Sequence, residues 1–583
     1  MMKTVNLLNK NLSQYENSSV DVLVVSTNFD PNEKYDYSIL NLNDETNSRK
    51  LRNTEHILDS GFRILKNGGL LFVYGLPKWL PHFAVFLDSL EDENSRMIFK
   101  YWIALDLDEK PRKETLPPAH MGLLMYLKSR KGESTSPFHL NTKTVRIPYM
   151  MCKACGENIR DWGGKKHLLN PVGAALSDIW RDLPKADLKE NVIPEKVLER
   201  IYNLVEREEI NFVHAIENTK LYSKAKSVEE SSTSLRIGAN SYDNLDMDVV
   251  LHGDSLEYME RILKLHPNGI FDLVFADPPY NLEKGYTHYK DSLSDKKYIQ
   301  WSYRWLDLMS RVVRPGGAFF VLNLPKYCTH YASFLNQKLN FRHWIVWDSM
   351  STPAGKIMPA HYSLLYYTRP GGPITFNYSA NNSDDLNILN PLDADYYCLQ
   401  SGCIRKRKML GDDDKTDLND IWWNIHRLKH KKYRDQHPCQ LPIRLMLRII
   451  KLTTNVNDIV FDPFCGAGTT AIAAKTTGRH FITIDIDEKY VKIATRNLER
   501  MQPTLMGNYY LPRQNQKYQR AKITKKEVEI GYIELCKDKG RVIEIEEVEK
   551  LDPILFDKIN GFYKDFKTLK KIAHRRLEIH TLV

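Results

Sequence analysis

Residues 271–281 have the sequence FDLVFADPPYN and residues 458–474 have the sequence DIVFDPFCGAGTTAIAA, and these two stretches decide the fold. Each begins with a short apolar run that stops at a turn of prolines or glycines. The second turn leads into an alanine-rich run with the composition of a helix. Such alternation is typical of βα units around a parallel sheet, so we expect an open α/β sheet.

The first stretch places a carboxylate, a backbone carbonyl and an aromatic ring at the end of its strand, where open α/β sheets bind ligands. The Asp277 carboxylate and the Pro278 carbonyl can accept two N–H bonds from an aromatic amine, while the Tyr280 ring stacks on its face. We take Asp277, Pro278, Pro279 and Tyr280 as candidate catalytic residues. The alternative is a surface turn that happens to contain two prolines.

The second stretch predicts a ligand site at the same edge of the sheet. Gly466 and Gly468 allow the backbone to come close to a ligand. A further apolar run, FITID at 481–485, ends in a carboxylate that is placed to bind the two hydroxyls of a ribose. A lone pair of glycines would be weak evidence, but strand, glycine turn, helix and acid stand here in the expected order.

With both motifs in place, residues 249–500 resemble the β-class of amino-methyltransferases, in which the catalytic tetrapeptide precedes the cofactor glycine loop. The resemblance implies a Rossmann-like open sheet, S-adenosylmethionine as donor and a flipped-out base as acceptor. Four further segments fit the same family: LHGDSL at 251–256, MPAHYSLLY at 358–366, DIWW at 420–423 and HPCQLP at 437–442.

The resemblance also implies which residues hold the cofactor. They are Asp254, Asn281, His437, Gln440, Phe461, Asp462, Phe464, Gly466, Gly468, Thr469 and Asp485. The sequence departs from the commoner family pattern at Cys439, where Thr is more frequent, and at Leu441, where Lys is more frequent.

The tetrapeptide begins with Asp277, which favours adenine N6 as the methylated amine, because Ser at this position is commoner among cytosine enzymes of the family. Cytosine N4 is the nearest alternative. An RNA substrate and a non-catalytic DNA-binding subunit are two further alternatives, although the sequence shows no recognisable RNA module.

The chain also contains an earlier copy of the same pattern. NGGLLFVYGLPKWLPHFAVFL at 67–87 matches PGGAFFVLNLPKYCTHYASFL at 315–335, and PAH and DIW tripeptides follow in the same order in both copies. A collinear series of this length predicts a duplicated fold. We expect four segments: a degenerate methyltransferase-like domain at 1–216, a linker at 217–241, a catalytic domain at 242–505 and a small helical basic tail at 515–583.

The first copy lacks both sets of chemical groups. Ser26 to Phe29 stands where the second copy has its catalytic tetrapeptide, and no glycine loop follows Ile201. We expect a catalytically silent copy that forms an intramolecular pseudo-dimer with the second and extends its nucleic-acid surface. A relic that serves stability alone is the alternative.

Cysteine spacing points to a metal site shared by the two copies. Cys152 and Cys155 form a knuckle-like C-K-A-C turn, and Cys398 and Cys403 stand at roughly the corresponding place in the second copy. Two such pairs would complete a tetrahedral Cys₄ zinc site. Unliganded reduced thiols are the alternative.

Composition sets the broad class. The 583 residues carry a net charge of +10, which suits a polyanionic partner such as double-stranded DNA, and the basic runs at 403–408 and 427–434 are candidate phosphate contacts. A cognate restriction endonuclease is a further expected partner. Eight cysteines are too few for a disulfide framework, no apolar stretch is long enough to cross a bilayer, and the first residues lack a signal-peptide core, so we expect a cytoplasmic protein.

Overall fold

The computed structural model describes most of the two halves and parts of the tail. The described residues are 2–7, 12–107, 116–132, 140–142, 145–149, 151–152, 154–158, 167, 169–186, 192–205, 210–217, 245–282, 292–349, 357–377, 398, 402–403, 405, 409, 418–425, 427, 440–503, 509–510, 525–552, 555–556, 559–560, 563 and 565–578. His437 and most of the two basic runs lie outside them. Within the described part of the chain, no helix has the length and apolar character that a membrane span requires.

The first half forms a seven-stranded sheet in the order β1-β9-β2-β3-β5-β4-β8, in which β5 runs antiparallel to both neighbours. Its strands are β1 (Met2–Leu7), β2 (Val20–Ser26), β3 (Leu65–Gly75), β4 (Ser95–Asp106), β5 (His120–Arg130), β8 (Ile179–Trp180) and β9 (Phe212–Glu217). Its helices are η1 (Leu12–Gln14), η2 (Pro31–Tyr35), α1 (Glu45–Ile64), α2 (Leu80–Ser89) and α3 (Glu195–Val205), and β6 (Arg146–Ile147) pairs with β7 (Ala174–Ala175) as a separate ribbon.

The second half repeats this plan in an eight-stranded sheet of order β10-β17-β16-β11-β12-β14-β13-β15, with β14 antiparallel to both neighbours. Its strands are β10 (Val249–His252), β11 (Phe271–Ala276), β12 (Val313–Asn323), β13 (Asn340–Asp348), β14 (His361–Thr368), β15 (Ile421–Trp422), β16 (Ile459–Asp462) and β17 (His480–Asp485). Its helices are α4 (Ser255–Leu265), α5 (Asp295–Val312), α6 (Pro325–Leu335), α8 (Ile443–Thr453), α9 (Thr469–Thr476) and α10 (Glu488–Glu499), and β18 (Gln502–Pro503) pairs with β19 (Tyr509–Tyr510).

Two mixed α/β sheets confirm the expected fold class. Their central strands are buried along almost their whole length, as strands of a sheet covered on both faces are. Every residue of β11 is buried, as are six of the seven residues of β2. Strands buried on both sides need continuous apolar runs rather than alternation, which is why FDLVFA and VDVLVVS carry almost no exposed polar positions.

Strand register gives a residue-by-residue correspondence between the halves. Val22 lies opposite Leu70 in the first sheet, and Leu273 lies opposite Ala318 in the second. Because Leu70 and Ala318 each follow the Gly-Gly pair at the same distance, Val22 corresponds to Leu273, and four residues later Ser26 corresponds to Asp277.

The sheets differ in the strand that lies beyond this shared core. In the second half the neighbour of β16 is β17, which follows it in sequence, whereas in the first half the neighbour of β9 is β1, from the start of the chain. In the first sheet, strand β1 therefore occupies the position that β17, which ends in Asp485, occupies in the second sheet.

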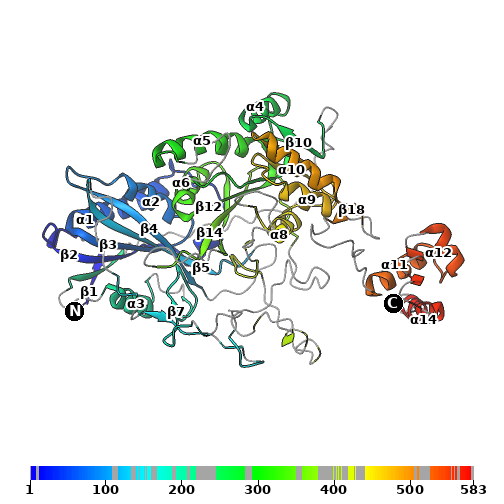
Figure 1. Ribbon diagram of the computed structural model, residues 1–583. Helices are drawn as coiled ribbons and strands as arrows, with labels where there is room; N and C mark the ends of the chain where they lie inside the picture. Colours follow the sequence, from blue (N-terminus) through cyan, green and yellow to red (C-terminus); the bar gives the residue numbers. More distant parts are fainter. Residues whose placement is uncertain are drawn as a thin grey trace.

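The two halves pack on each other through equivalent elements. Helices α2 and α6 are in contact, and Figure 1 shows them side by side between the sheets. One continuous cluster of buried apolar residues includes members from both halves. The rings of Trp102 and Trp344 stack within this cluster, with centroids 3.8 Å apart.

The tail forms three described helices, α11 (Lys525–Asp538), α12 (Ile545–Leu551) and α14 (Phe566–Glu578). They share a small apolar core of their own, which includes Val528, Tyr532 and Leu569. The Tyr532 hydroxyl donates a hydrogen bond to the Ile543 carbonyl, 2.7 Å away, which ties α11 to the segment before α12.

Candidate active site

The candidate catalytic tetrapeptide lies where β11 ends, at the carboxyl edge of the second sheet. The Asp277 carboxylate accepts a hydrogen bond from the Tyr280 hydroxyl, so these two side chains are held together across the Pro-Pro turn. The Tyr280 ring packs against Tyr362 with centroids 5.5 Å apart. The turn therefore presents a carboxylate beside an aromatic ring at the end of the strand.

A buried hydrogen-bond network supports this turn from below. The Tyr298 hydroxyl on α5 donates to the Pro279 carbonyl, and the Asn323 side-chain amide at the end of β12 donates to Tyr298 at 2.9 Å. The same amide donates to Tyr331 at 3.1 Å, and Tyr331 also bonds Ser302 at 2.9 Å. The network fixes the Pro279 carbonyl of the turn. The sequence motifs did not predict this network.

A signal for these residues does exist in the internal repeat. The constant spacing that places Gly316 on Gly68 also places Tyr298 on Lys50 and Asn323 on Gly75. The first half therefore has neither the hydroxyl nor the amide of the network. A comparison that asked where the copies differ, as well as where they agree, would have singled out both residues.

A cavity of about 200 Å³ opens in front of the turn. Eleven of the fifteen predicted catalytic and cofactor residues line it: Asp254, Asp277, Pro278, Pro279, Tyr280, Gln440, Asp462, Phe464, Gly466, Thr469 and Asp485. The indoles of Trp301 and Trp305 also line it and pack against the Phe464 ring, with centroids 6.0 and 5.3 Å apart.

The glycine turn shapes the cavity wall between β16 and α9. Gly466 has a φ of 52°, and its N–H donates to the Asp485 carboxylate at 2.8 Å. Gly468 has a φ of 83°, and a Cβ there would lie 2.7 Å from the Ala494 Cβ on α10. The first glycine faces the cavity, and the second permits close packing of α9 on α10.

Three predicted cofactor residues lie away from the cavity lining, and His437 lies outside the described residues. Phe461 is buried and stacks on Phe271 at a centroid distance of 4.5 Å, so it belongs to the core. The Asn281 side chain exchanges hydrogen bonds with the backbone of Leu293, at 2.8 and 2.7 Å. Asn281 therefore shapes the loop after the turn, and Gly468, the third, packs against helix α10 instead.

Three carboxyls in the cavity influence one another electrostatically. Burial, with the Asp462 charge adding to it, raises the pKa of Asp277 to about 8. Burial also raises the pKa of Asp462 to about 7, with a further contribution from Asp485. For Asp485 itself burial raises the pKa to about 6. A cation placed among these carboxyls would stabilise their ionised forms, so the cavity favours a cationic ligand.

The cavity wall also holds a carboxylate that the sequence analysis missed. Asp487 caps α10 through its Oδ1 atom, which accepts from the Lys489 N–H at 2.9 Å. Its buried Oδ2 atom has no hydrogen-bond partner among the described residues, although the residue lines the cavity. This oxygen is therefore available to accept a hydrogen bond from a group bound in the cavity.

In the first half, the corresponding positions bond one another. Val22 lies opposite Phe212, and Leu273 lies opposite Val460, so His214 corresponds to Asp462. The Ser26 hydroxyl and the His214 ring lie 3.0 Å apart, and the Ile193 N–H donates to Ser26 at 3.2 Å.

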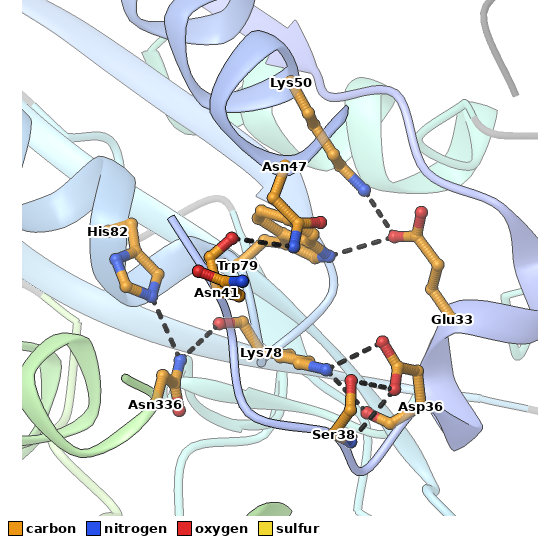
Figure 2. A network of polar contacts seen from close by, with 10 residues as sticks. All are labelled: Glu33, Asp36, Ser38, Asn41, Asn47, Lys50, Lys78, Trp79, His82 and Asn336. Atoms are coloured by element: carbon orange, nitrogen blue, oxygen red, sulfur yellow. Dashed lines mark hydrogen bonds and ion pairs between the residues drawn. The ribbon is translucent and has the colours of Figure 1, made fainter. Parts of the chain in front are cut away.

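The first half also contains a network of polar contacts, which Figure 2 shows. The Lys50 ammonium pairs with Glu33, which also accepts from the Trp79 indole at 2.9 Å. Lys78 bonds Asp36, and its own carbonyl accepts from the Asn336 amide of the second half at 2.8 Å. These polar groups satisfy one another and link the halves.

Known DNA methyltransferases are similar to this chain. A family profile described as DNA methylase, for N6 and N4 methyltransferases, matches residues 271–496. The chain is 32% identical over 312 residues to the Type II methyltransferase M.BamHI of Bacillus amyloliquefaciens, with 51% of this chain and 69% of that protein covered. It is 28% identical over 255 residues to the DNA adenine methyltransferase YhdJ of Escherichia coli strain K12, with 43% and 82% covered. The crystal structure of the M1.HpyAVI–SAM complex covers 43% of this chain and 98% of its own, at 21% identity and a TM-score of 0.30.

Proposed function

Because this chain belongs to the N6/N4 DNA methylase family, we propose that its second half methylates a base amine of DNA within the cavity at the end of β11. The enzyme uses S-adenosylmethionine as methyl donor. The observation that carries the proposal is the position of the catalytic turn and the glycine loop on two walls of one cavity.

The described residues fit this cofactor. The Asp485 carboxylate ends β17 at the cavity, in the place proposed for a ribose. Asp254 lies beside it at the start of α4, because the Gly253 N–H donates to the Asp485 carbonyl at 3.1 Å. The unpartnered Oδ2 atom of Asp487 is an acceptor for a further donor group. When bound, S-adenosylmethionine supplies an electrophilic methyl group on a sulfonium ion, a cation that suits the buried carboxyls.

The protein contributes position and electrostatics. The Asp277 carboxylate accepts one N–H of the base amine and a carbonyl of the turn accepts the other, which favours a more tetrahedral nitrogen with an available lone pair. The Tyr280 ring stacks on the base, which must leave the duplex because its amine is otherwise unreachable. No covalent enzyme intermediate is needed, and Tyr298 holds the turn in place through Pro279.

We propose adenine N6 as the target. An Asp at the head of the tetrapeptide supports it, as does the similarity to a protein named DNA adenine methyltransferase. The relative from Bacillus amyloliquefaciens is named a Type II methyltransferase, which supports site-specific methylation and a restriction endonuclease as partner.

For the first half we propose a catalytically silent copy that pairs with the second as an intramolecular pseudo-dimer. We keep the division into 1–216, 217–241, 242–505 and 515–583 as part of this proposal. Its support is the repeated sheet order, the contact of α2 with α6, and the replacement of Asp277 and Asp462 by Ser26 and His214.

Labelled S-adenosylmethionine with double-stranded DNA, followed by nucleoside mass spectrometry, tests the function. We expect N6-methyladenine with the full chain and none with Asp277→Ala. N4-methylcytosine as the product would overturn the choice of base. Label in RNA alone would contradict the proposal that DNA is the substrate. No transfer to either polymer would contradict the proposed methyltransferase activity.

A further inference from the structure

Four cysteines from the two halves converge outside the cavity. Cys152 and Cys155 follow β6 in the first half, and Cys398 and Cys403 lie between β14 and β15 in the second half. All four sulfur atoms lie within 4.8 Å of one another. Two of the separations cross between the halves, with Cys152 Sγ 3.8 Å from Cys403 Sγ and Cys155 Sγ 3.6 Å from Cys398 Sγ.

These separations decide between two kinds of cross-link. A disulfide requires sulfur atoms about 2.0 Å apart. A tetrahedral zinc ion with Zn–S bonds of about 2.3 Å holds its sulfur ligands about 3.8 Å apart. The observed distances match the edges of the tetrahedron and exceed the disulfide distance almost twofold.

The local backbone is built to direct two thiols to one point. The Cys152 N–H donates to the Glu157 carbonyl at 2.7 Å, and the Gly156 N–H donates back to the Cys152 carbonyl at 2.9 Å. Gly156 has a φ of 69°, a left-handed conformation that glycine adopts without strain. The turn therefore closes directly after the second thiol.

Apolar packing gives no other reason for the cluster. Cys152, Cys398 and Cys403 form a group of buried residues that no other buried apolar side chain joins. Backbone N–H groups of Cys398, Cys155 and Ala154 are directed at the Cys152 sulfur. Donors aimed at a sulfur stabilise the thiolate, which is the form that binds metals.

We propose that Cys152, Cys155, Cys398 and Cys403 bind one structural zinc ion that joins the two halves of the chain. Four protein thiolates complete a tetrahedral shell and leave no position for water or substrate, so the ion has a structural role. It ties the ribbon of β6 and β7 in the first half to the segment that leads to β15 in the second.

Metal content of the full chain, purified under reducing conditions without chelators, tests the proposal. We expect one zinc ion per chain, and loss of that ion in Cys155→Ser and in Cys398→Ser. Cys536→Ser is the matched control, because Cys536 is also a buried cysteine but lies in the tail core, and it should keep the ion. Cobalt in place of zinc should give the absorption bands of a tetrahedral thiolate site.

A chelator supplies a measurement on the unaltered chain in case a variant fails to fold. Removal of the ion should lower the unfolding temperature, and added zinc should restore it. Unaltered chain that neither contains zinc nor takes it up, a Cys155→Ser variant with full metal content, or Cys152–Cys403 and Cys155–Cys398 disulfides in freshly reduced protein would each overturn the proposal.

Discussion

The indoles of Trp102 and Trp344 stack face to face, with centroids 3.8 Å apart and planes 3° from parallel. The two residues occupy equivalent places, since Trp102 lies opposite Leu124 and Trp344 lies opposite Leu365 in matching strand pairs. A stack of equivalent residues places an approximate two-fold axis between them. The contact is thus of the isologous kind that symmetric dimers use.

Reciprocal contacts between a histidine and an aspartate are related by the same axis. The His120 ring lies 3.1 Å from Asp420, and the equivalent His361 ring lies 3.1 Å from Asp178. Each carboxylate also accepts a backbone N–H from the other half, from Ala119 at 2.8 Å and from Ala360 at 2.9 Å. Because buried carboxylates without partners are costly, these contacts specify one way of packing the halves together.

We predict that Trp102→Ala destabilises the full chain by about 3–5 kcal/mol, because it removes a fully buried aromatic side chain and leaves a cavity between the halves. Trp102→Phe should cost much less, since a smaller ring still stacks on Trp344. Denaturant unfolding followed by two probes measures both variants. A midpoint unchanged by Trp102→Ala would contradict the view that this stack supports the interface.

A second prediction concerns the catalytic carboxylate. Asp277→Ala should lower methyl transfer by at least about 10²-fold, the usual scale for removing a group that contacts the reacting atoms, while cofactor affinity changes little. Ser26→Ala, at the equivalent position in the first half, should leave the rate per folded molecule unchanged. Single-turnover methylation with both variants measures the contrast, and equal losses would refute the assignment of the active copy.

The third prediction separates positioning from binding. Tyr298→Phe removes the hydroxyl that holds the Pro279 carbonyl, so kcat should fall by about tenfold, the size expected for one buried hydrogen bond. Cofactor affinity should not change. Tyr303→Phe, on the same helix but stacked on Phe334, is the control. A larger effect on cofactor affinity than on kcat would show that the network serves the cofactor pocket instead.

The sequence predicted those features of the site that depend on short, contiguous motifs. The Pro-Pro turn and the glycine turn each follow one strand, and topology alone brings two neighbouring parallel strands, β11 and β16, to a common edge. Single-residue roles were less accessible. Phe461 sits in a motif that faces the cavity, but its own side chain points into the core and stacks on Phe271.

Contacts between distant parts of the chain could not be derived from motifs at all. Asn323 acts through Tyr298 and Tyr331, which come from two helices, and Asp487 is recognisable only by its orphaned oxygen at the cavity. Likewise, β1 takes the position in the first sheet that corresponds to β17 in the second. This arrangement depends on the start of the chain pairing with β9 at the edge of the sheet. Such packing choices leave no local pattern.

The fourth prediction tests the ribose acid. Asp485→Asn should weaken S-adenosylmethionine binding, because a neutral amide accepts hydroxyl protons less strongly than a carboxylate and no longer offsets the cationic ligand. Glu488→Gln should leave affinity unchanged, because Glu488 is an exposed residue three positions after Asp485 and its carboxylate pairs with Lys492. Calorimetry of the unaltered chain should give one cofactor site. Two sites per chain would show that the first half also binds it.

The last prediction is a pH dependence of cofactor binding. Burial raises the pKa of Asp277 to about 8, of Asp462 to about 7 and of Asp485 to about 6. These carboxyls hold protons at pH values where the unfolded chain has lost them, so their contribution to stability is full below about pH 4 and is lost as the pH rises through 6 to 8.

A cationic ligand reverses this preference, because its charge stabilises the ionised carboxylates and lowers their pKa values. Binding of S-adenosylmethionine should therefore release protons, and affinity should rise between about pH 6 and pH 8 while the stability of the free protein falls. Calorimetry in two buffers of different ionisation enthalpy measures the released protons directly. In Asp462→Asn the hydrogen bond from Phe464 can persist, but the proton released near pH 7 should disappear. An affinity that stays flat across this range, or proton uptake in place of release, would mean that the cation does not lie among these carboxyls.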